Sequence, residues 1–338
     1  MKRFSGKQLR GKRIVWPKKE TVEIESFEIR DPEEKQVLIE AAKTAISPGT
    51  EIAFLRAMPN TPGKFPMYPG WCHAGTITQV GSKVTNFKIG DRVFSWSHHA
   101  SHALASEERR VLPIPENLSF SRATFINLAS IALLGIRRAQ IELGESVAVI
   151  GQGPVGLLAL QLAKLSGGLP VVGIDLIDRR LEVSSGYGAD YTLNPNAHSF
   201  KNKVADITQG KGFNVIIEVT GNPEAIARSL KLAGKHARMV LLGSARGESR
   251  VNFYSDVHKK GVHMIGVHDS LRPCYESSAG RWTLKEDCNV IIALLSKDRL
   301  GVDELISEEV SFLDAPQAYK KIIENKETVI TIVLNWVR

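Results

Sequence analysis

The sequence predicts an α/β protein that combines a doubly wound parallel sheet with a second, β-rich domain. Apolar strand-like runs alternate with helical runs between residues 146 and 269, which is typical of a parallel sheet covered by helices. The first 118 residues instead show short alternating runs broken by Gly, Pro and Asn, as in an antiparallel barrel. Since 338 residues suffice for two domains, we place one at 1–118, completed by about 305–338, and the other at 119–304.

Composition narrows the class of protein. Hydrophobic residues make up 43% of the chain and charged residues 24%, and no apolar run approaches the roughly 20 residues that a membrane span needs. The basic N-terminus has no apolar stretch behind it, so it does not predict a secretory signal. The three cysteines are widely spaced, which predicts neither a disulfide framework nor a zinc ribbon. We expect a cytoplasmic protein with no membrane partner.

The net charge of +8 raises the question of a polyanionic partner. Lys and Arg are scattered among acidic residues and form no nucleic-acid-binding motif, so we expect no nucleic-acid partner. The exception is a basic cluster in the first 19 residues. It favours a solvated edge, and the alternative is attraction of an anionic substrate or partner.

A glycine-rich turn carries the strongest functional signal. The run VAVI ends at Ile150 and reads as a buried strand, whereas LLALQLAKL after Gly156 reads as a helix. The intervening GQGPVG has the G-x-G-x-x-G spacing that lets backbone approach a pyrophosphate at a helix N-terminus. The predicted cofactor-binding residues of this turn are Gly151, Gly153, Pro154, Val155 and Gly156.

An acidic residue ends the next strand-like run, PVVGID. Asp175 lies nineteen residues after Gly156, where dinucleotide-binding folds use an acid to bind the adenosine ribose. A carboxylate there repels a 2′-phosphate, so the sequence favours NAD, with NADP still possible. Further strands are predicted at FNVIIEVTG, ARMVLLGSA and VHMIGVHD, about six in all. Because ligands bind beyond the carboxyl ends of such strands, Thr220 and Gly243 should face the nicotinamide.

The C-terminal region returns to the first domain. Residues 283–300 and 314–326 read as helices that open with the N-cap candidates Thr283 and Asp314. The terminal run TVITIVLNWV reads as a strand and is expected to join the barrel.

From about residue 20 onward, the chain resembles the medium-chain dehydrogenase/reductase superfamily. The resemblance rests on AISPGTE, YPGWCHAGTITQVG, FKIGDRVF, LGESVAVIGQGPVGLLALQLAK and GADYTLNP. It implies a GroES-like catalytic domain, a Rossmann NAD-binding domain and a homodimer or homotetramer. It also implies that Arg180 contacts the adenosine ribose. AISPGTE is most similar to a zinc-less branch that includes the dehydrogenase of the bacteriochlorophyllide hydroxyethyl group.

The positions that match the family's zinc ligands carry other residues. The resemblance places ligands at Ser47, at Trp71 and near Ile126, and neither an indole nor a butyl group can bind zinc. Cys72 and His73 stand where a glutamate and a following residue would be, so we interpret Cys72 as a packed thiol and His73 as structural. The sequence therefore predicts no metal site and no zinc cofactor.

Without zinc, a protein group must stabilise or protonate the alkoxide that forms during hydride transfer. Ser47, Thr50 and Glu51 occupy the segment that faces the nicotinamide in relatives and are the first catalytic candidates. Glu51 could act as a general acid if burial raises its pKa. A turn with Glu51 capping a helix is the structural alternative. His99 matches a position near the cleft and is a candidate proton relay.

The predicted function is interconversion of a secondary alcohol and a ketone on a polar small molecule, such as a sugar or polyol, by an NAD(P)-dependent, zinc-independent oxidoreductase. Two alternatives stay open. Several zinc-less relatives reduce conjugated C=C bonds or quinones and prefer NADPH. The fold could also retain a cofactor without catalysis.

Overall fold

The structure, a computed structural model, describes residues 10–108, 111–279 and 281–337. It divides into two compact units. The first contains the chain up to Asn127 and again from Ile306, and the second runs Leu128–Leu305. Among the described helices, none is long and apolar enough to cross a lipid bilayer. Positions 1–9 of the basic N-terminal cluster lie outside the described residues.

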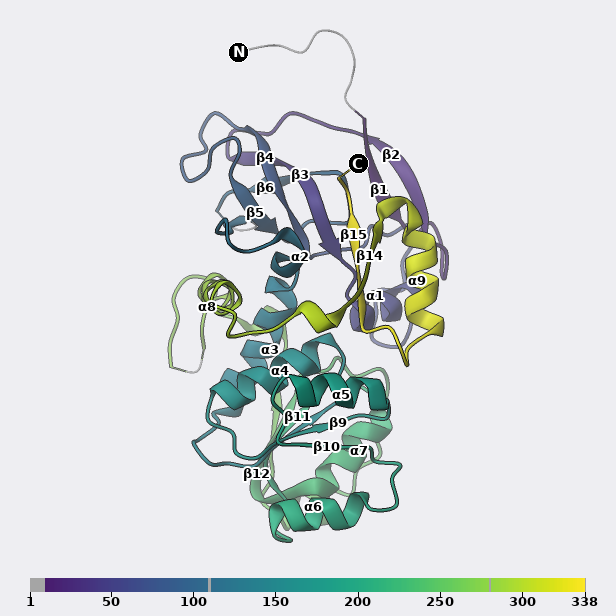
Figure 1. Ribbon diagram of the computed structural model, residues 1–338, viewed down its shortest axis with the longest axis vertical. Helices are drawn as coiled ribbons and strands as arrows, with labels where there is room; N and C mark the ends of the chain where they lie inside the picture. The colour runs from purple at the N-terminus through teal and green to yellow at the C-terminus, as the bar shows by residue number, and fades with distance from the viewer. Residues whose placement is uncertain (1–9, 109–110, 280, 338) are drawn as a thin grey trace. The chain divides into compact units, whose positions relative to one another are not determined.

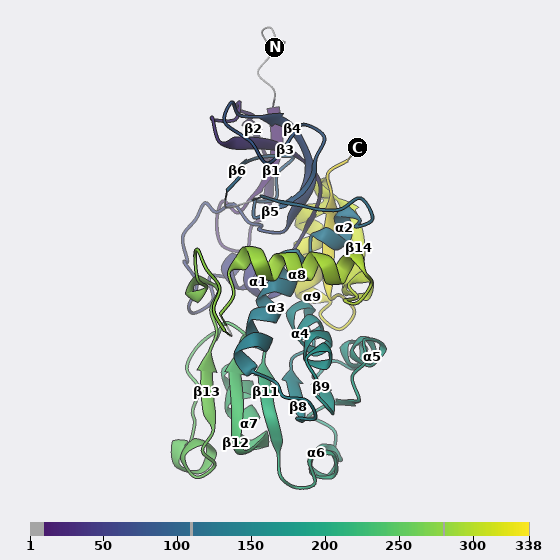
Figure 2. The same ribbon diagram turned by 90° about the vertical axis from the view of Figure 1, so that its left-hand side faces the viewer.

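The second unit is built on a six-stranded sheet in which all neighbouring strands are parallel. Its order is β10-β9-β8-β11-β12-β13, so the chain builds outward from β8 in one direction and then from β11 in the other (Figure 2). This is the strand order of dinucleotide-binding folds, and it confirms the predicted doubly wound sheet. The strands are β8 (Val147–Ile150), β9 (Val171–Ile174), β10 (Tyr191–Leu193), β11 (Phe213–Glu218), β12 (Ala233–Leu241) and β13 (His263–Gly266).

Helices pack against this sheet. The helix α4 contacts β8 and β9, α5 contacts β9 and β10, and α7 contacts β11 and β12 (Figure 1). Every residue of β8 and β9 is buried, as expected for strands that are covered on both faces. The helices are α3 (Ile126–Ala139), α4 (Pro154–Leu165), α5 (Asp178–Gly186), α6 (Phe200–Thr208), α7 (Pro223–Leu232) and α8 (Leu284–Ser296), with short turns at Tyr254–His258, Asp269–Leu271 and Asp303–Leu305.

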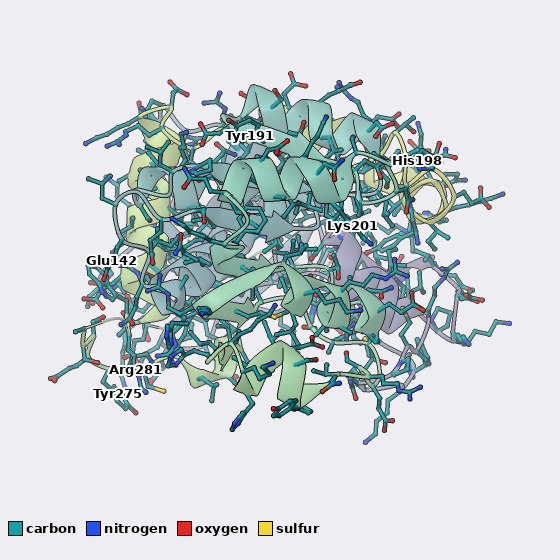
Figure 3. All side chains as sticks on the ribbon, turned by 90° about the horizontal axis from the view of Figure 1, so that it is seen from below. Glu142, Tyr191, His198, Lys201, Tyr275 and Arg281 are labelled. Atoms are coloured by element: carbon teal, nitrogen blue, oxygen red, sulfur yellow. The ribbon has the colours of Figure 1, made fainter. Side chains whose placement is uncertain are left out.

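The connection between β13 and α8 contains exposed and buried segments. Tyr275 is 87% exposed, and both Tyr275 and Arg281 lie at the outer edge of the view in Figure 3. The connection ends at Thr283, whose side-chain oxygen accepts the backbone N–H of Glu286. The predicted N-cap of this helix is therefore confirmed.

A buried ion cluster anchors the same connection. Arg272 is 8% exposed, and its guanidinium donates to Asp287 and, at 2.6 Å, to the Ser130 carbonyl of α3. Arg137, also on α3, donates from Nε to the other carboxylate oxygen of Asp287 at 2.6 Å. Since Asp287 is fully buried, both cations compensate a charge that water cannot reach.

The first unit contains a seven-stranded sheet and a separate two-stranded sheet. Strand β15 pairs with β3 in antiparallel fashion, which confirms that the C-terminal strand returns to the β-rich domain. On its other side β15 pairs in parallel with β14, a strand that the sequence pattern did not indicate. The strands are β1 (Arg10–Val15), β2 (Glu23–Glu28), β3 (Gln36–Ala45), β4 (His73–Val80), β5 (Arg92–Ser95), β6 (His102–Ser106), β7 (Val111–Pro113), β14 (Ile306–Ser311) and β15 (Thr331–Asn335).

Aromatic contacts join the C-terminal elements to the core of the first unit. Trp16 and Tyr319 pack edge to face with ring centroids 5.7 Å apart, and Phe312 stacks on Trp336 at 4.5 Å. All four side chains belong to one buried cluster, so residues from both ends of the chain share a core. The helices of this unit are α1 (Pro48–Leu55), α2 (Phe120–Ala123) and α9 (Ala315–Glu324), with a short turn at Phe312–Asp314.

Candidate functional site

The glycine-rich turn joins β8 to α4 in the second unit. Gly153 is the N-cap residue of α4, and Pro154 opens the helix. The turn follows β8, which lies beside β11 at the point where the strand order reverses. Open α/β sheets bind ligands at this switch point, and a helix N-terminus directs unsatisfied N–H groups toward an anion there.

The three glycines of the turn differ in what surrounds them. Gly151 has φ +92°, and a Cβ on it would lie 2.7 Å from the side chain of Thr220. A Cβ on Gly156 would lie 1.8 Å from the carbonyl oxygen of Gly151. A Cβ on Gly153 would meet no atom within 4 Å. The first and third glycines are therefore required by the fold itself, whereas the space at Gly153 is open to a ligand.

Asp175 lies directly after β9 and contacts the turn. Its Oδ2 accepts the N–H of Gln152 at 2.6 Å, and its Oδ1 accepts the N–H of Ile177 at 2.9 Å. Burial lowers the pKa of the Arg180 guanidinium on α5, and the nearby charge of Asp175 opposes that shift. The structure thus brings Asp175 and Arg180 together beside the glycine turn.

Thr220 follows β11 and Gly243 follows β12. The buried carboxylate of Glu218 holds the backbone just after β11. Glu218 accepts hydrogen bonds from the hydroxyl and the N–H of Thr220 and from the N–H of Gly221. Burial raises the pKa of Glu218, and these hydrogen bonds oppose the shift. A Cβ on Gly243 would lie 2.5 Å from the nitrogen of Gly221, so the two loops are in close contact.

The predicted catalytic residues all lie in the first unit. Ser47 is the N-cap residue of α1, and its side chain makes no capping hydrogen bond. Glu51 and His99 are fully buried, Ser47 is 5% exposed, and Thr50 is partly exposed. Within the described residues, neither the Ser47 nor the Thr50 hydroxyl hydrogen-bonds another protein group. These two hydroxyls are therefore available to a ligand.

Glu51 and His99 form part of a buried hydrogen-bond network. One oxygen of Glu51 accepts the N–H of Ser47 at 2.8 Å. The other oxygen contacts His99 Nε2 at 3.1 Å and accepts the hydroxyl of Tyr319. On the far side of the imidazole, His99 Nδ1 lies 2.7 Å from the hydroxyl oxygen of Thr44. Sequence spacing could not have indicated Tyr319, which lies 268 residues from Glu51.

Cys72 and His73 lie in the interior of the first unit. Both are fully buried. Burial and the charge of Glu51 raise the pKa of the Cys72 thiol far above its ordinary value, so this thiol is a poor nucleophile. His73 Nδ1 lies 3.3 Å from the Ser95 hydroxyl, and its Nε2 has no hydrogen-bond partner among the described residues. These surroundings match two packed side chains.

The donors around this segment do not fit zinc. Trp71 packs edge to face on Phe54, and Ile126 is a fully buried alkyl group. Among the described residues, no three His, Cys, Asp or Glu side chains converge on a point where a metal could bind. A zinc site needs three or four such ligands at about 2.0 to 2.3 Å.

The buried imidazole of His73 leads to a prediction about acid stability. Burial lowers its pKa from 6.5 to about 3. The unfolded chain therefore binds the extra proton first, and stability that is complete above pH 6.5 is lost as the pH falls toward 3. We expect His73 to cost about 2 kcal/mol of the free energy of unfolding at pH 5 relative to pH 7.

Urea unfolding of His73→Phe at the two pH values measures this difference. The variant should lose that part of the pH dependence, whereas the same change at the exposed His198 should leave it intact. An unchanged pH dependence in His73→Phe would contradict the prediction.

Two histidines near His99, His98 and His102, line a cavity of about 350 Å³ within the first unit. His98 and His102 share it with Trp96 and Arg13. The indole N–H of Trp96 donates to the Asn127 side-chain oxygen at 2.8 Å, so Trp96 connects the cavity wall to the start of α3.

Two families of known domains match the chain in the order of its two units. The family described as "Alcohol dehydrogenase GroES-like domain" matches residues 33–119, and "Zinc-binding dehydrogenase" matches residues 154–279. The chain belongs to the zinc-type alcohol dehydrogenase-like superfamily of medium-chain dehydrogenases/reductases. This membership confirms the predicted GroES-like and Rossmann architecture and the enzyme class, an oxidoreductase of the alcohol dehydrogenase type.

Members of this superfamily resemble the chain over most of its length. D-guloside 3-dehydrogenase of Escherichia coli (strain K12) is 27% identical over 267 residues, which cover 78% of this chain and 75% of that protein. Sorbitol dehydrogenase 1 of Saccharomyces cerevisiae is 26% identical over 347 residues, which cover 90% and 92%. The structure of galactitol-1-phosphate dehydrogenase from Escherichia coli superimposes with a TM-score of 0.83 at 21% identity and covers 96% and 99%.

Proposed function

We propose that the protein is an NAD(P)-dependent, zinc-independent oxidoreductase that interconverts a secondary alcohol and a ketone on a hydroxylated, polar small molecule. The observation that best supports this proposal is the glycine turn at the switch point of the sheet, with the Asp175 carboxylate beside it. Membership of an alcohol dehydrogenase superfamily supports the reaction type.

The cofactor would be held in the second unit. When bound, it accepts a hydride from the alcohol carbon or returns one to the carbonyl carbon. The turn from Gly151 to Gly156 would receive the pyrophosphate, Asp175 and Arg180 the adenosine ribose, and Thr220 and Gly243 the nicotinamide side. The Asp175 carboxylate would repel a 2′-phosphate, so we propose a preference for NAD over NADP.

Hydroxyl groups of the first unit would donate a hydrogen bond or a proton to the substrate oxygen. The hydroxyls of Ser47 and Thr50 lack protein partners in the described structure, so either can hydrogen-bond the substrate oxygen. Glu51 and His99, the other two catalytic candidates, are fully buried. In this proposal the two hydroxyls replace the effect of zinc on the alkoxide, because no three His, Cys, Asp or Glu side chains converge among the described residues.

Relatives support the substrate class. Those named above are dehydrogenases of a guloside, of sorbitol and of galactitol 1-phosphate, all of which carry several hydroxyl groups. We further propose a cytoplasmic homodimer or homotetramer. The strand β13 forms one edge of the six-stranded sheet, and its Met264 is 37% exposed, which suits contact with a second copy.

Gly153→Ala tests the cofactor site. The added methyl meets no protein atom, so the free energy of unfolding should hardly change. It would fill the space through which a pyrophosphate approaches the backbone N–H groups, so we expect NADH to bind roughly 10- to 100-fold more weakly. Titration of NADH fluorescence measures the affinity. Gly186→Ala, also open within 4 Å and at the end of α5, is the matched control and should bind NADH normally.

The reaction type is tested with the wild-type enzyme. We expect turnover of polyols or ketoses with NAD(H). Strong preference for NADPH together with turnover of enones or quinones would instead favour a C=C or quinone reductase. Tight cofactor binding without turnover of any alcohol, ketone or enone would indicate a non-catalytic protein.

A further inference from the structure

Four buried side chains of the first unit form a hydrogen-bond chain that runs in one direction to Glu51, and a fifth, Tyr319, donates to Glu51 from the other side. The indole N–H of Trp336 donates to the Thr44 oxygen at 2.9 Å. The Thr44 hydroxyl proton then has one acceptor within the described structure, Nδ1 of His99 at 2.7 Å. His99 must therefore carry its proton on Nε2 and donate it to Glu51 at 3.1 Å.

The chain ends at the Glu51 carboxylate, which receives donors only. Besides His99, it accepts the hydroxyl of Tyr319 and the backbone N–H of Ser47. A buried carboxylate needs such donors because it has lost its water. Glu51 and His99 are 0% exposed and Tyr319 is 1% exposed, so a substrate cannot reach these groups in this structure.

Glu51 instead contacts the backbone of residues 47–51, the segment that carries the proposed catalytic hydroxyls. Ser47 precedes Pro48 of α1 and lacks a side-chain cap, and the Glu51 carboxylate bonds its N–H from one turn away. The carbonyl of Ser47 in turn accepts the N–H of Glu51 at 2.9 Å. Two hydrogen bonds between Ser47 and Glu51, one from the Glu51 side chain and one from its backbone, thus close the segment that carries the Ser47 and Thr50 hydroxyls.

We infer that Glu51 and His99 are positioning residues, and that Tyr319, Thr44 and Trp336 are positioning residues that act through them. This inference rests on the proposed function, since it divides the proposed catalytic residues into those that contact the substrate and those that position them. The hydroxyls of Ser47 and Thr50 contact the substrate, while the network holds them at a fixed place. Elements at the C-terminus, α9 and the residue after β15, thereby contribute to catalysis by a site near residue 50.

The test compares Tyr319→Phe and Thr44→Val with Thr44→Ser. Tyr319→Phe and Thr44→Val remove one hydroxyl each at nearly constant volume, and Thr44→Ser keeps the hydroxyl. We expect kcat to fall about tenfold or more in the first two, because small misplacements of catalytic groups have effects of that order. Thr44→Ser should recover most of the lost kcat. KM and NADH affinity should change little, and the pH dependence of kcat should keep its limbs.

The pH profile of kcat in Glu51→Gln tests the opposite assignment, in which Glu51 itself is the proton donor. If Glu51 is the proton donor, Gln removes one limb of the kcat pH profile, while Tyr319→Phe and Thr44→Val leave kcat unchanged. That result would overturn the inference. A merely structural role would lower the yield or the unfolding midpoint of Thr44→Val but leave kcat of the folded enzyme unchanged, which also contradicts it.

A readout without turnover separates this inference from the proposed function. Hydrogen exchange of the backbone amides of Ser47 and Glu51, the two that are hydrogen-bonded in this segment, should become faster in Tyr319→Phe than in wild type. If the wild-type protein turns over no alcohol or ketone but this protection is lost, the proposed function fails and the positioning network stands. If protection is unchanged, the network fails whatever the reaction.

Discussion

Asp287→Ala should lower the free energy of unfolding of the second unit by about 3 to 5 kcal/mol, because it breaks a buried ion cluster from one side. The Asp287 carboxylate is fully buried and is bonded by Arg137 and Arg272. Its removal leaves two guanidinium groups near one another, and the Arg272 side chain is only 4% exposed. The urea midpoint of the variant relative to wild type measures the change.

The matched control is an exposed carboxylate of the same unit. Glu224 pairs with Arg228 one helical turn later at 3.4 Å, and both side chains are largely exposed. Glu224→Ala should cost less than about 1 kcal/mol. Equal costs for the two variants would show that the buried cluster does not anchor the connection from β13 to α8.

Gly70→Ala should destabilise the first unit and slow the reaction. Gly70 has φ +106°, and a Cβ on it would lie 2.6 Å from the backbone nitrogen of His99 and 2.9 Å from two carbons of its ring. The imidazole would have to move, and with it the bond to Glu51. We expect about 1 to 3 kcal/mol of overpacking cost in addition to the backbone strain, and a lower kcat.

Gly90→Ala is the control for backbone strain, and the difference between the two variants gives the steric part of the effect. Gly90 also has a positive φ, +94°, but a Cβ there would meet no atom within 4 Å. The variant should carry the strain alone and keep wild-type kcat. If thermal unfolding shows equal losses for Gly70→Ala and Gly90→Ala, close packing against His99 is unimportant.

The sequence predicted those elements of the fold that have local signals. The glycine turn, the apolar strands and the Thr283 cap depend on neighbouring residues, so periodicity and capping chemistry indicate them. Helix α1 was predicted only as an alternative, in which Glu51 caps a helix, because SPGTE also suits a turn. In the structure its Ile52 and Leu55 pack into the core of the first unit. Strand β14 was missed because its pattern is largely polar and its partner β15 lies about twenty residues later.

The catalytic region shows the same limit. Ser47, Thr50 and Glu51 could be chosen from one segment, and His99 from a match near the cleft. Their hydrogen-bond network also includes Tyr319 of α9 and Trp336, the residue after β15. Contacts between residues so far apart in the chain produce no recognisable motif or spacing in the sequence. The role of Glu218 could have been noticed from the sequence, because an acidic residue at the end of an otherwise apolar strand is unusual.

We propose that this member of a zinc-type superfamily transfers hydride without zinc. Its most direct test is the rate of NAD-dependent polyol oxidation by protein that has been treated with a chelator and shown by elemental analysis to hold far less than one zinc per chain. We expect the treated protein to keep the full rate of untreated enzyme, with no increase when zinc is added. Loss of activity on chelation that zinc restores would contradict it.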